Sequence, residues 1–220
     1  MNNTRKKALV LAGSRGIGGA IAKALDEIEF LDVDALSSRD LDTSELEKCM
    51  EICKLYGNID VLVLNTGGPP AKSFSEITLS DWEKYHNQLF LGFALILQNL
   101  KVNDGGFIFL ISSYNIKEPD SNLILSNTYR VAFASLLKSL SPSFAEREVS
   151  CLNIAPGPID TDRFNELNSD PIAVGKSFPM KRVGKPEEIG NFVASIVQKN
   201  ISYLSGVTIN FDGAISKSLF

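Results

Sequence analysis

Short apolar runs alternate with amphipathic segments along the whole chain. The run KALVLAG at 7–13 ends in glycine, which is typical of a buried strand that leads into a turn. Helical spacing follows at 18–28, where apolar residues recur on one face. The same pattern predicts further strands at 32–37, 59–65, 105–113, 149–157 and 205–214, and further helices at 43–57, 80–100, 125–144 and 185–198.

This alternation of strand and helix predicts right-handed βαβ units. Such units build a parallel sheet that is covered by helices on both faces. We therefore expect an α/β fold, a single doubly wound Rossmann domain over 1–220 with about six to seven parallel strands. The least regular stretch, 158–185, follows a strand end, where open α/β sheets bind ligands, so we expect it to form a substrate loop or lid.

Two of the predicted helices begin with the spacing of a capping box. In such a box a hydroxyl residue and a glutamate three positions later accept hydrogen bonds from each other's backbone N–H. The two pairs are Ser44 with Glu47 and Ser80 with Glu83, and the spacing predicts that the helices begin at these serines.

The composition suits one globular domain, since the chain has 220 residues, of which 44% are hydrophobic. The net charge is −4 and there is no basic block, which argues against a general role in nucleic-acid binding. No apolar stretch approaches the roughly 20 residues that span a bilayer, so we expect no membrane segment. The basic N-terminus resembles a signal peptide only superficially, because the glycine-rich turn follows its short apolar run at once.

The sequence contains few residues that could form a metal site or disulfide bonds. His86 is the single histidine, so we expect no metal site. The three cysteines do not make a disulfide framework. Cys49 and Cys53 lie one helical turn apart, where they are expected to act as small apolar residues. This use of cysteine favours a reducing cytoplasm.

The segment AGSRGIGGA follows the first predicted strand and opens the first predicted helix. A strand, a glycine-rich turn and a helix in this order are the context of a dinucleotide-binding site. Gly16 and Gly18 let the backbone approach a pyrophosphate at the helix N-terminus, where free N–H groups and the helix dipole favour anions. The candidate cofactor residues of this turn are Gly13, Ser14, Arg15, Gly16, Ile17 and Gly18.

The end of the second predicted strand bears on the type of dinucleotide. NAD-binding folds commonly carry a carboxylate there, against the ribose 2′-hydroxyl. Here Ser38 and Arg39 stand where a 2′-phosphate would bind, and Arg15 lies in the glycine turn. Hydroxyls and an arginine fork suit phosphate, so the sequence favours NADP(H) over NAD(H). Two alternatives stay open, since Arg39 can be an ordinary surface charge and Asp40 can reach the ribose.

Several segments spread over nearly the whole chain share one pattern. They are AGSRGIG (12–18), LNTGG (64–68), ISS (111–113), APGPIDTD (155–162), FPMKRVGKPEE (178–188) and SGVTINFDG (205–213). Together they make the chain resemble the short-chain dehydrogenases/reductases, and within that superfamily a divergent branch similar to 3-oxoacyl-(acyl-carrier-protein) reductases. The resemblance implies an NAD(P)(H)-dependent enzyme that reduces a carbonyl, such as a 3-oxoacyl thioester, or oxidises a secondary alcohol. It also implies a homodimer or homotetramer that pairs through the helices at 80–100 and 125–144.

The resemblance further implies a role for each matching position. Ser113 would bond the substrate carbonyl, and Asp40 and Leu41 would border the adenine. The other positions would hold the rest of the cofactor, namely Asn65, Thr66 and Gly67 at the ribose, and Pro156, Gly157, Ile159 and Thr161 at the nicotinamide amide.

The chain also departs from the family pattern. Ala12 replaces the first glycine of the turn, and Leu89 stands at the active-site asparagine of the fourth helix. A helix and a strand that relatives carry after the second strand are missing. Leu89 concerns the catalytic half of the site, whereas Ala12 and the missing helix and strand concern the cofactor half.

The most consequential departure concerns the family's catalytic tyrosine–lysine pair. Counting forward from Ser113 and back from KSL at 138–140 places this pair at Ser126 and Arg130. A serine is a far weaker acid than a phenol, and an arginine stays protonated, although it can still stabilise negative charge. The proton donor stays open among water, Ser126, Tyr114 and Tyr129, and for Tyr129 we favour a packing role.

Two functions follow from these residues. The first is a reductase or dehydrogenase with catalytic Ser113, Ser126 and Arg130, acting on a small-molecule or acyl-carrier-linked carbonyl. The second is an NADP(H)-binding regulator or assembly subunit without turnover. The basic residues of 158–185 can meet an acidic carrier protein or can be ordinary surface charges; they are Arg163, Lys176, Lys181 and Arg182.

Overall fold

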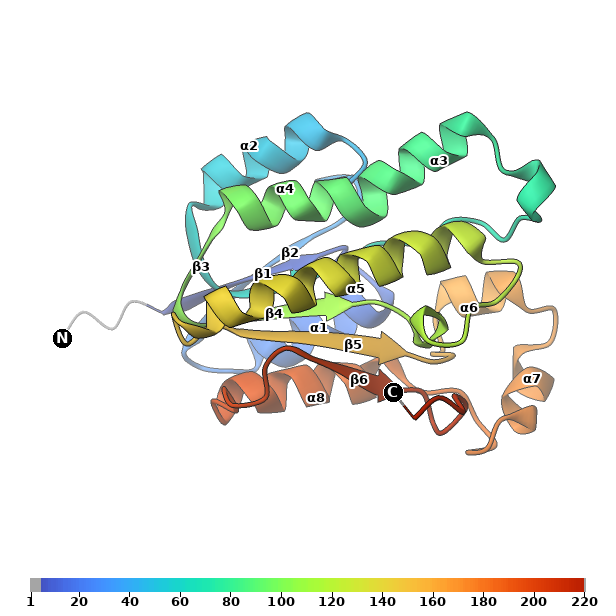
Figure 1. The fold of residues 1–220 in the computed structure, drawn as a ribbon. Coiled ribbons are helices and arrows are strands. Elements are labelled where there is room, and N and C mark those ends of the chain that lie inside the picture. The colour runs from blue at the N-terminus through green and yellow to red at the C-terminus, as the bar shows by residue number, and fades with distance from the viewer. Residues whose placement is uncertain (1–4, 220) are drawn as a thin grey trace.

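Six parallel strands form one sheet in the computed structural model, which describes residues 5–219. Their order across the sheet is β2-β1-β3-β4-β5-β6, so the connection from β2 to β3 passes across β1 (Figure 1). All neighbouring strands pair in parallel. The strands are β1 (Lys6–Leu11), β2 (Leu31–Leu36), β3 (Asn58–Leu64), β4 (Lys101–Ile111), β5 (Ser150–Pro156) and β6 (Val207–Phe211).

Helices cover both faces of this sheet (Figure 1). One face carries α1 (Gly16–Asp26) and α8 (Pro186–Gln198), which pack against each other, and the other carries α2 (Leu46–Tyr56), α4 (Gly92–Asn99) and α5 (Ile124–Ala145). The remaining helices are η1 (Phe74–Glu76), α3 (Leu79–His86), η2 (Asn87–Leu91), η3 (Tyr114–Ile116), α6 (Asp162–Leu167) and α7 (Pro171–Ser177). Within residues 5–219, none of the helices is long and apolar enough to cross a bilayer.

The central strands are apolar on both faces because each face meets a layer of helices. Along β1, Ala8 and Val10 join the core beneath α1 and α8, whereas Leu9 and Leu11 join the core beneath α2, α4 and α5. Successive side chains of a strand point to opposite faces, so a near-continuous apolar run feeds two cores at once. This is why the sequence shows unbroken apolar runs where the strands lie.

The predicted fold is confirmed, with six strands and every expected helix present within a few residues of its predicted bounds. The helix expected at 80–100 consists of α3 and α4 joined by the π-helical turn η2. The sheet ends at β2, in agreement with the strand and helix that the sequence lacks after that position.

Both predicted capping boxes are wrong. Asp42 accepts hydrogen bonds from the backbone N–H (2.9 Å) and the hydroxyl (2.8 Å) of Ser44, so this serine belongs to a turn and α2 begins after it. At α3 the box is formed by Thr78 and Asp81, and the helix therefore begins before Ser80. In each case an aspartate carboxylate accepts the hydrogen bond from a backbone N–H near the start of the helix, that of Ser44 or that of Thr78.

The stretch 158–185 is more regular than its sequence indicates. It holds two short helices, α6 and α7, and each has a side-chain N-cap. Thr161 accepts a hydrogen bond from the Phe164 N–H (3.3 Å), and Asp170 accepts one from the Ala173 N–H (2.9 Å). These caps satisfy free N–H groups at the starts of helices that are too short to show a periodic pattern. Its role as a substrate lid stays a prediction.

The cysteines are buried thiols, as expected for Cys49 and Cys53. Burial raises the pKa of Cys49 and of Cys53 to about 11, and that of Cys151 to about 12. Thiols that stay protonated inside an apolar core are unreactive. Their role is therefore packing between the sheet and the helices of one face.

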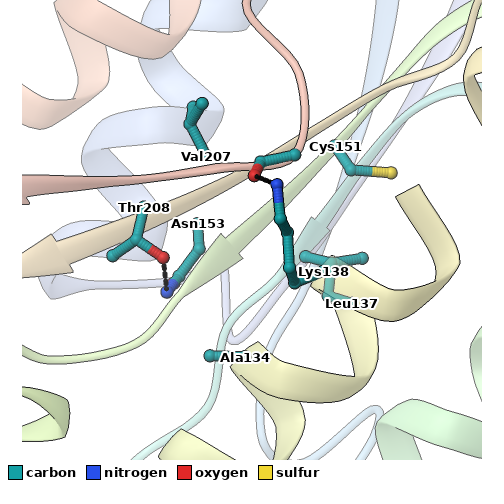
Figure 2. Close-up of a pocket in the computed structure, with 8 residues that line it drawn as sticks. Ala134, Leu137, Lys138, Cys151, Asn153, Val207 and Thr208 are labelled. Carbon is teal, nitrogen blue, oxygen red and sulfur yellow. Dashed lines mark hydrogen bonds between the residues drawn. The ribbon is translucent and has the colours of Figure 1, made fainter. Parts of the chain in front are cut away.

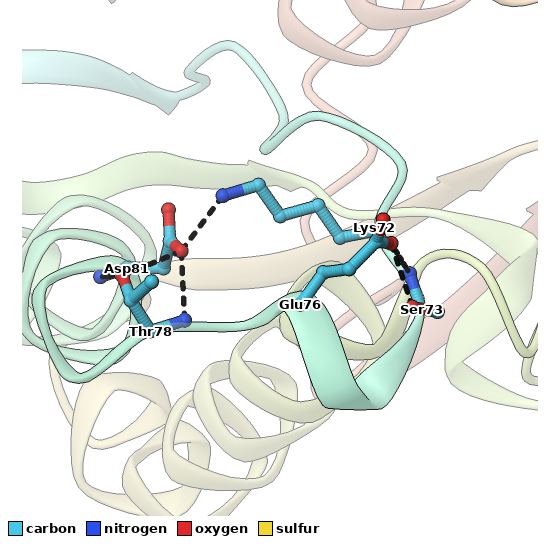
Figure 3. A network of polar contacts seen from close by, with 5 residues as sticks. All are labelled: Lys72, Ser73, Glu76, Thr78 and Asp81. Atoms are coloured by element: carbon cyan, nitrogen blue, oxygen red, sulfur yellow. Dashed lines mark hydrogen bonds and ion pairs between the residues drawn. The ribbon is translucent and has the colours of Figure 1, made fainter.

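A polar network holds the segment that leads from β3 into α3 (Figure 3). Lys72 Nζ donates to the Asp81 carboxylate (2.8 Å), which also accepts from the Thr78 N–H and hydroxyl. Beside it, the Glu76 carboxylate accepts from the Ser73 N–H and hydroxyl. The hydrogen bond from Lys72, together with those from Thr78, lowers the pKa of Asp81 to about 2.

Acid should destabilise the fold by protonating Asp81 and Glu188. The pKa of Glu188 is also lowered to about 2, chiefly by hydrogen bonds from Arg182. In the unfolded chain both carboxylates have ordinary pKa values near about 4. The lowered folded values therefore stabilise the fold above about pH 4, and this stabilisation is lost as the pH falls toward about 2. The free energy of unfolding, measured by urea denaturation at each pH, should fall across this range.

Lys72→Met should raise the pKa of folded Asp81 and so make that fall smaller. The control is Lys54→Met, which removes an exposed lysine of α2 that forms no ion pair within the described residues. A pH dependence in Lys72→Met that matches the unaltered protein would contradict the role of this ion pair.

Candidate active site

A large cleft opens at the carboxyl ends of the strands. Its volume is about 740 Å³, within the range of small-molecule and cofactor sites. Its walls come from the turn after β1, the loops after β3, β4 and β5, and the first turns of α5. The strand order switches between β1 and β3, and open α/β sheets bind ligands at such a switch.

The glycine-rich turn wraps closely around the N-terminus of α1. A Cβ on Gly18 would lie 2.2 Å from the Ala12 carbonyl oxygen and 2.6 Å from Asn65 Nδ2, so only glycine fits. Ala12 itself has a φ of 47°, a left-handed conformation that alanine rarely adopts. The N-cap residue of α1 is Arg15, whose side chain has no acceptor atom and therefore does not cap the helix. The first N–H groups of the helix thus stay available to an anion. This cradle suits the pyrophosphate of a dinucleotide.

Most of the predicted cofactor residues come together in the cleft. Gly13 and Gly18 are exceptions within the turn, because they lie behind its surface and shape it. The residues that line the cleft are Ser14, Arg15, Gly16, Ile17, Ser38, Leu41, Asn65, Thr66, Gly67, Arg130, Pro156, Gly157, Ile159 and Thr161.

Arg39 and Asp40 do not line the cleft. The Asp40 carboxylate turns back to accept hydrogen bonds from the hydroxyl (2.7 Å) and the backbone N–H (2.8 Å) of Ser37, and these bonds lower the pKa of Asp40. Arg39 donates its backbone N–H to the Ser37 hydroxyl (3.2 Å). Of the residues predicted at the end of β2, Ser38 and Leu41 are the ones that reach the cleft.

The helix α6 spans the mouth of the cleft. On one side Asp162 pairs with Arg15 of the glycine turn, with 2.8 Å between Nη1 and Oδ2. On the other side Arg163 donates from Nη2 to the carbonyl of Pro69, in the loop after β3. The first pair is well exposed and contributes little to stability. The two contacts therefore show how α6 lies over the cleft, but they do not fix it there strongly.

Arg130 is the cation at the inner end of the cleft. Its Nε donates to the Ser126 hydroxyl (3.2 Å), which places both side chains on one face of α5. Its Nη1 donates to the Ile111 carbonyl (2.9 Å) at the end of β4, and its Nη2 to the Thr66 carbonyl (3.3 Å) beyond β3. Burial, and secondly the charge of Arg163, lower the pKa of Arg130 to about 10, so the guanidinium is still protonated at neutral pH.

Ser113 lies at the carboxyl end of β4 and lines the same cleft. Its hydroxyl oxygen accepts a hydrogen bond from the Asn115 N–H (3.2 Å) at the start of η3. That bond orients the hydroxyl and leaves its proton free for an acceptor in the cleft. Ser113, Ser126 and Arg130 all line the cleft, the first from the end of β4 and the other two from α5. Their catalytic roles stay predictions.

Tyr129 lies outside the cleft. Its hydroxyl donates to the Trp82 carbonyl (3.1 Å), and its ring packs edge-on against the Trp82 ring with 6.0 Å between centroids. This confirms the packing role, because the helical spacing turns Tyr129 toward α3 while Ser126 and Arg130 face the strands. Tyr114 does line the cleft, but burial and then the charge of Asp120 raise its pKa, which makes it a weaker acid.

Gln88 is a site residue that the sequence reasoning missed. Its Nε2 donates to the Thr66 hydroxyl (3.2 Å) and to the Gly67 carbonyl (3.1 Å), which holds the loop after β3. Leu89, at the position of the family's asparagine, packs instead with Tyr85 and other apolar residues. The sequence offered one signal, that Gln88 directly precedes Leu89. The π-helical turn around Gln88, a feature that often marks functional sites, is visible only in the structure.

A second cavity lies between α5, β5 and β6, away from the cleft (Figure 2). Its volume of about 10 Å³ is enough for roughly one water molecule. Lys138 Nζ donates to the Gly206 carbonyl (2.6 Å), and Asn153 Nδ2 donates to the Thr208 hydroxyl (3.1 Å). These contacts join α5 to the edge of the sheet, and the cavity is too small for a substrate.

The parallel sheet, the glycine turn at the start of α1 and the cleft at the strand ends define a doubly wound α/β protein of the dinucleotide-binding class. The family model described as "Enoyl-(Acyl carrier protein) reductase" matches residues 31–216. The chain therefore belongs to this family of short-chain dehydrogenases/reductases, which confirms the predicted superfamily and makes it an oxidoreductase by class.

Curated relatives and solved structures agree with that assignment. The NADPH-dependent reductase BacG of Bacillus subtilis (strain 168) is 27% identical over 262 residues, covering 98% of this chain and 100% of that protein. The 3-oxoacyl-[acyl-carrier-protein] reductase FabG of Aquifex aeolicus (strain VF5) is 31% identical over 170 residues, covering 75% and 68%. A blue fluorescent protein from a metagenomic library, solved in complex with NADPH, superposes with a TM-score of 0.88 at 23% identity and covers 98% and 100%, which shows the shared fold.

Gly18→Ala should destabilise the fold, because the new Cβ would meet the Ala12 carbonyl and the Asn65 side chain, neither of which can withdraw freely. We expect the free energy of unfolding, measured by urea denaturation, to fall by about 2 kcal/mol or more. The matched control is Gly67→Ala, where a Cβ would meet no atom within 4 Å. Equal stability of the two variants would contradict the close packing of the turn.

Proposed function

We propose that this protein is an NADP(H)-dependent carbonyl reductase that works without the usual catalytic tyrosine. The observation that carries the proposal is the convergence of Ser113, Ser126 and Arg130 on the cleft that also contains the glycine turn. Two hydroxyls and a cation in one place suit a carbonyl oxygen on which negative charge develops.

The cofactor is NADP(H). The open N-terminus of α1 and Gly16, which lines the cleft without a side chain, suit a pyrophosphate, and Ser38 lines the cleft where a 2′-phosphate would lie. The relative named as an NADPH-dependent reductase and the structures solved in complex with NADPH support this choice. When bound, NADPH would supply the hydride that adds to the carbonyl carbon.

The chain's own residues would handle the oxygen of the substrate. The hydroxyls of Ser113 and Ser126 donate to the carbonyl oxygen, and Arg130 stabilises the alkoxide electrostatically. The Ser126 oxygen already accepts from Arg130 Nε, so its proton is free to point at the substrate. The alkoxide is about as basic as hydroxide, so it takes its proton from a water molecule, and this makes the alcohol. The hydroxide left behind is neutralised by solvent.

The reducible group is a ketone or a 3-oxoacyl thioester. Relatives named as 3-oxoacyl-[acyl-carrier-protein] reductases support the thioester, and the basic residues of 158–185 fit an acidic carrier. The segment 158–185 would act as the substrate lid through α6. The reverse reaction, oxidation of a secondary alcohol, uses the same groups.

A second candidate is an NADP(H)-binding protein without turnover. It is favoured by the serine at the tyrosine position and by Leu89, which is buried in an apolar cluster at the asparagine position. For either function we propose a homodimer or homotetramer that pairs through the α3–α4 and α5 helices, where Leu79 and Val131 are exposed.

Substitutions in the cleft should separate the catalytic residues from Tyr129. Ser113→Ala and Arg130→Met should each lower kcat/KM for NADPH-dependent reduction by about 100-fold, because each removes a group that stabilises the alkoxide. Tyr129→Phe should change it by no more than about threefold, since its hydroxyl bonds to Trp82 outside the cleft. Initial rates of NADPH oxidation provide the measurement.

A large loss in Tyr129→Phe would overturn the assignment of Ser126 to the catalytic position. The rates should be taken over a panel of 3-oxoacyl thioesters and small ketones. Tight NADPH binding without oxidation by any member of the panel would instead favour the protein without turnover.

The 2′-phosphate site can be tested at the end of β2. Ser38→Asp should weaken NADPH binding by at least about 10-fold while NADH binding changes little, because the new carboxylate repels the phosphate. Arg39→Ala is the control, since Arg39 lies outside the cleft, and its NADPH dissociation constant should stay within about twofold. Equal losses in both variants would show that Arg39 binds the phosphate. Fluorescence titration measures both constants.

A further inference from the structure

The charge of Arg130 is not balanced by the protein. All of its hydrogen-bond acceptors are neutral: the Ser126 hydroxyl and the carbonyls of Thr66, Ile111 and Ser112. Among residues 5–219, no carboxylate lies within ion-pair distance of it. A partly buried cation without a counter-ion is costly, and an anion that enters the cleft would relieve that cost.

A second cation lies nearby. Arg163 of α6 lines the same cleft, and its charge acts on the Arg130 guanidinium. Glu166 is its weak partner, with 3.6 Å between Oε2 and Arg163 Nη1. Both guanidinium groups lie at the same loop, because Arg130 Nη2 lies 3.9 Å from the place of a Cβ on Gly68 and Arg163 donates to the carbonyl of Pro69, the next residue.

The remaining acidic residues of the cleft are held elsewhere. Asp162 pairs with Arg15, and Asp120 accepts a hydrogen bond from the Asn122 N–H (2.7 Å). Asp42 is held by Ser44 in the turn before α2. Of Arg130 and Arg163, only Arg163 has a carboxylate partner within the described residues, Glu166, so the pair is left with one positive charge in excess.

Asn115 adds an unpartnered polar group to the same place. It lines the cleft beside Ser113, its side chain is 5% exposed, and its Oδ1 has no hydrogen-bond partner. Buried carboxamides are almost always hydrogen-bonded, so one left without a partner in a binding cleft points to a polar ligand. The unpartnered Oδ1 is an acceptor, so its partner must be a donor; a carboxylate has none, and Asn115 therefore does not decide which anion binds.

We propose that the substrate is an oxo acid, a carbonyl compound that carries its own carboxylate. Arg163 binds the carboxylate through the guanidinium N–H groups that Pro69 and Glu166 leave free, and Arg130 stabilises both the carboxylate and the developing alkoxide. Arg130 already donates to four protein acceptors, so Arg163 is the guanidinium with N–H groups left for a ligand. One guanidinium suits a single carboxylate better than a phosphate. The assignment rests on the proposed reductase function and, of the two reducible groups proposed there, selects a ketone that carries a free carboxylate over the thioester.

Binding of inert analogues to the NADPH-loaded protein tests this assignment. Oxamate and malonamate carry a carboxylate and cannot be reduced, and oxamide and malonamide are their neutral counterparts of similar shape. Titrations followed by the fluorescence of bound NADPH should show at least one of the acids binding roughly 10- to 100-fold more tightly than its neutral counterpart. Arg163→Ala should abolish that difference, and Arg163→Lys should keep part of it.

The control is Lys176→Ala, which removes an exposed positive charge from α7 that does not line the cleft, and it should preserve the preference for the acid. Equal binding of acids and amides, an unchanged preference in Arg163→Ala, or tighter binding of inorganic phosphate than of either acid would overturn the oxo-acid assignment. Failure of the unaltered protein to bind NADPH would instead overturn the proposed function itself.

Discussion

The hydrogen bonds of the Arg130 guanidinium organise the active edge of the sheet. One planar group reaches the Thr66 carbonyl beyond β3, the Ile111 carbonyl at the end of β4, and the Ser126 hydroxyl on α5. A lysine ammonium is a point charge on a flexible stem and lacks the rigid fork that holds these acceptors in one plane. The cation and the Ser126 hydroxyl are therefore held in fixed positions relative to the two strand ends, where the substrate would react.

The loop after β3 receives a second support from the π-helical turn η2. Gln88 bonds to Thr66 and Gly67, while its neighbour Leu89 is buried among apolar side chains. Arg130 from α5 and Gln88 from η2 thus both donate hydrogen bonds to the loop after β3. The loops around the cleft are therefore tied to the helices by charge-assisted and amide hydrogen bonds.

Much of the fold and part of the site could be predicted because the signals are local. Apolar runs and helical spacing depend on neighbours within a few residues, and the strand, glycine turn and helix of the cofactor cradle are consecutive. The placement of Ser126 with Arg130 followed from their spacing on one helix. Arg39 and Asp40 do not reach the cleft, because hydrogen bonds to Ser37 turn that segment back on itself. Such competition among short polar side chains is decided by turn geometry rather than by residue type.

By itself, the sequence determined the parallel sheet, the family and the cradle at the start of α1, since each is encoded in contiguous residues. The tertiary structure alone decided the electrostatics of the cleft. Arg130 and Arg163 are far apart in the chain, and α6 brings the second guanidinium to the same loop as the first while Arg15 and Ser44 hold nearby aspartates. The charge balance of the cleft depends on which charged side chains lie close together in the folded chain and which are already paired. No local sequence pattern shows that.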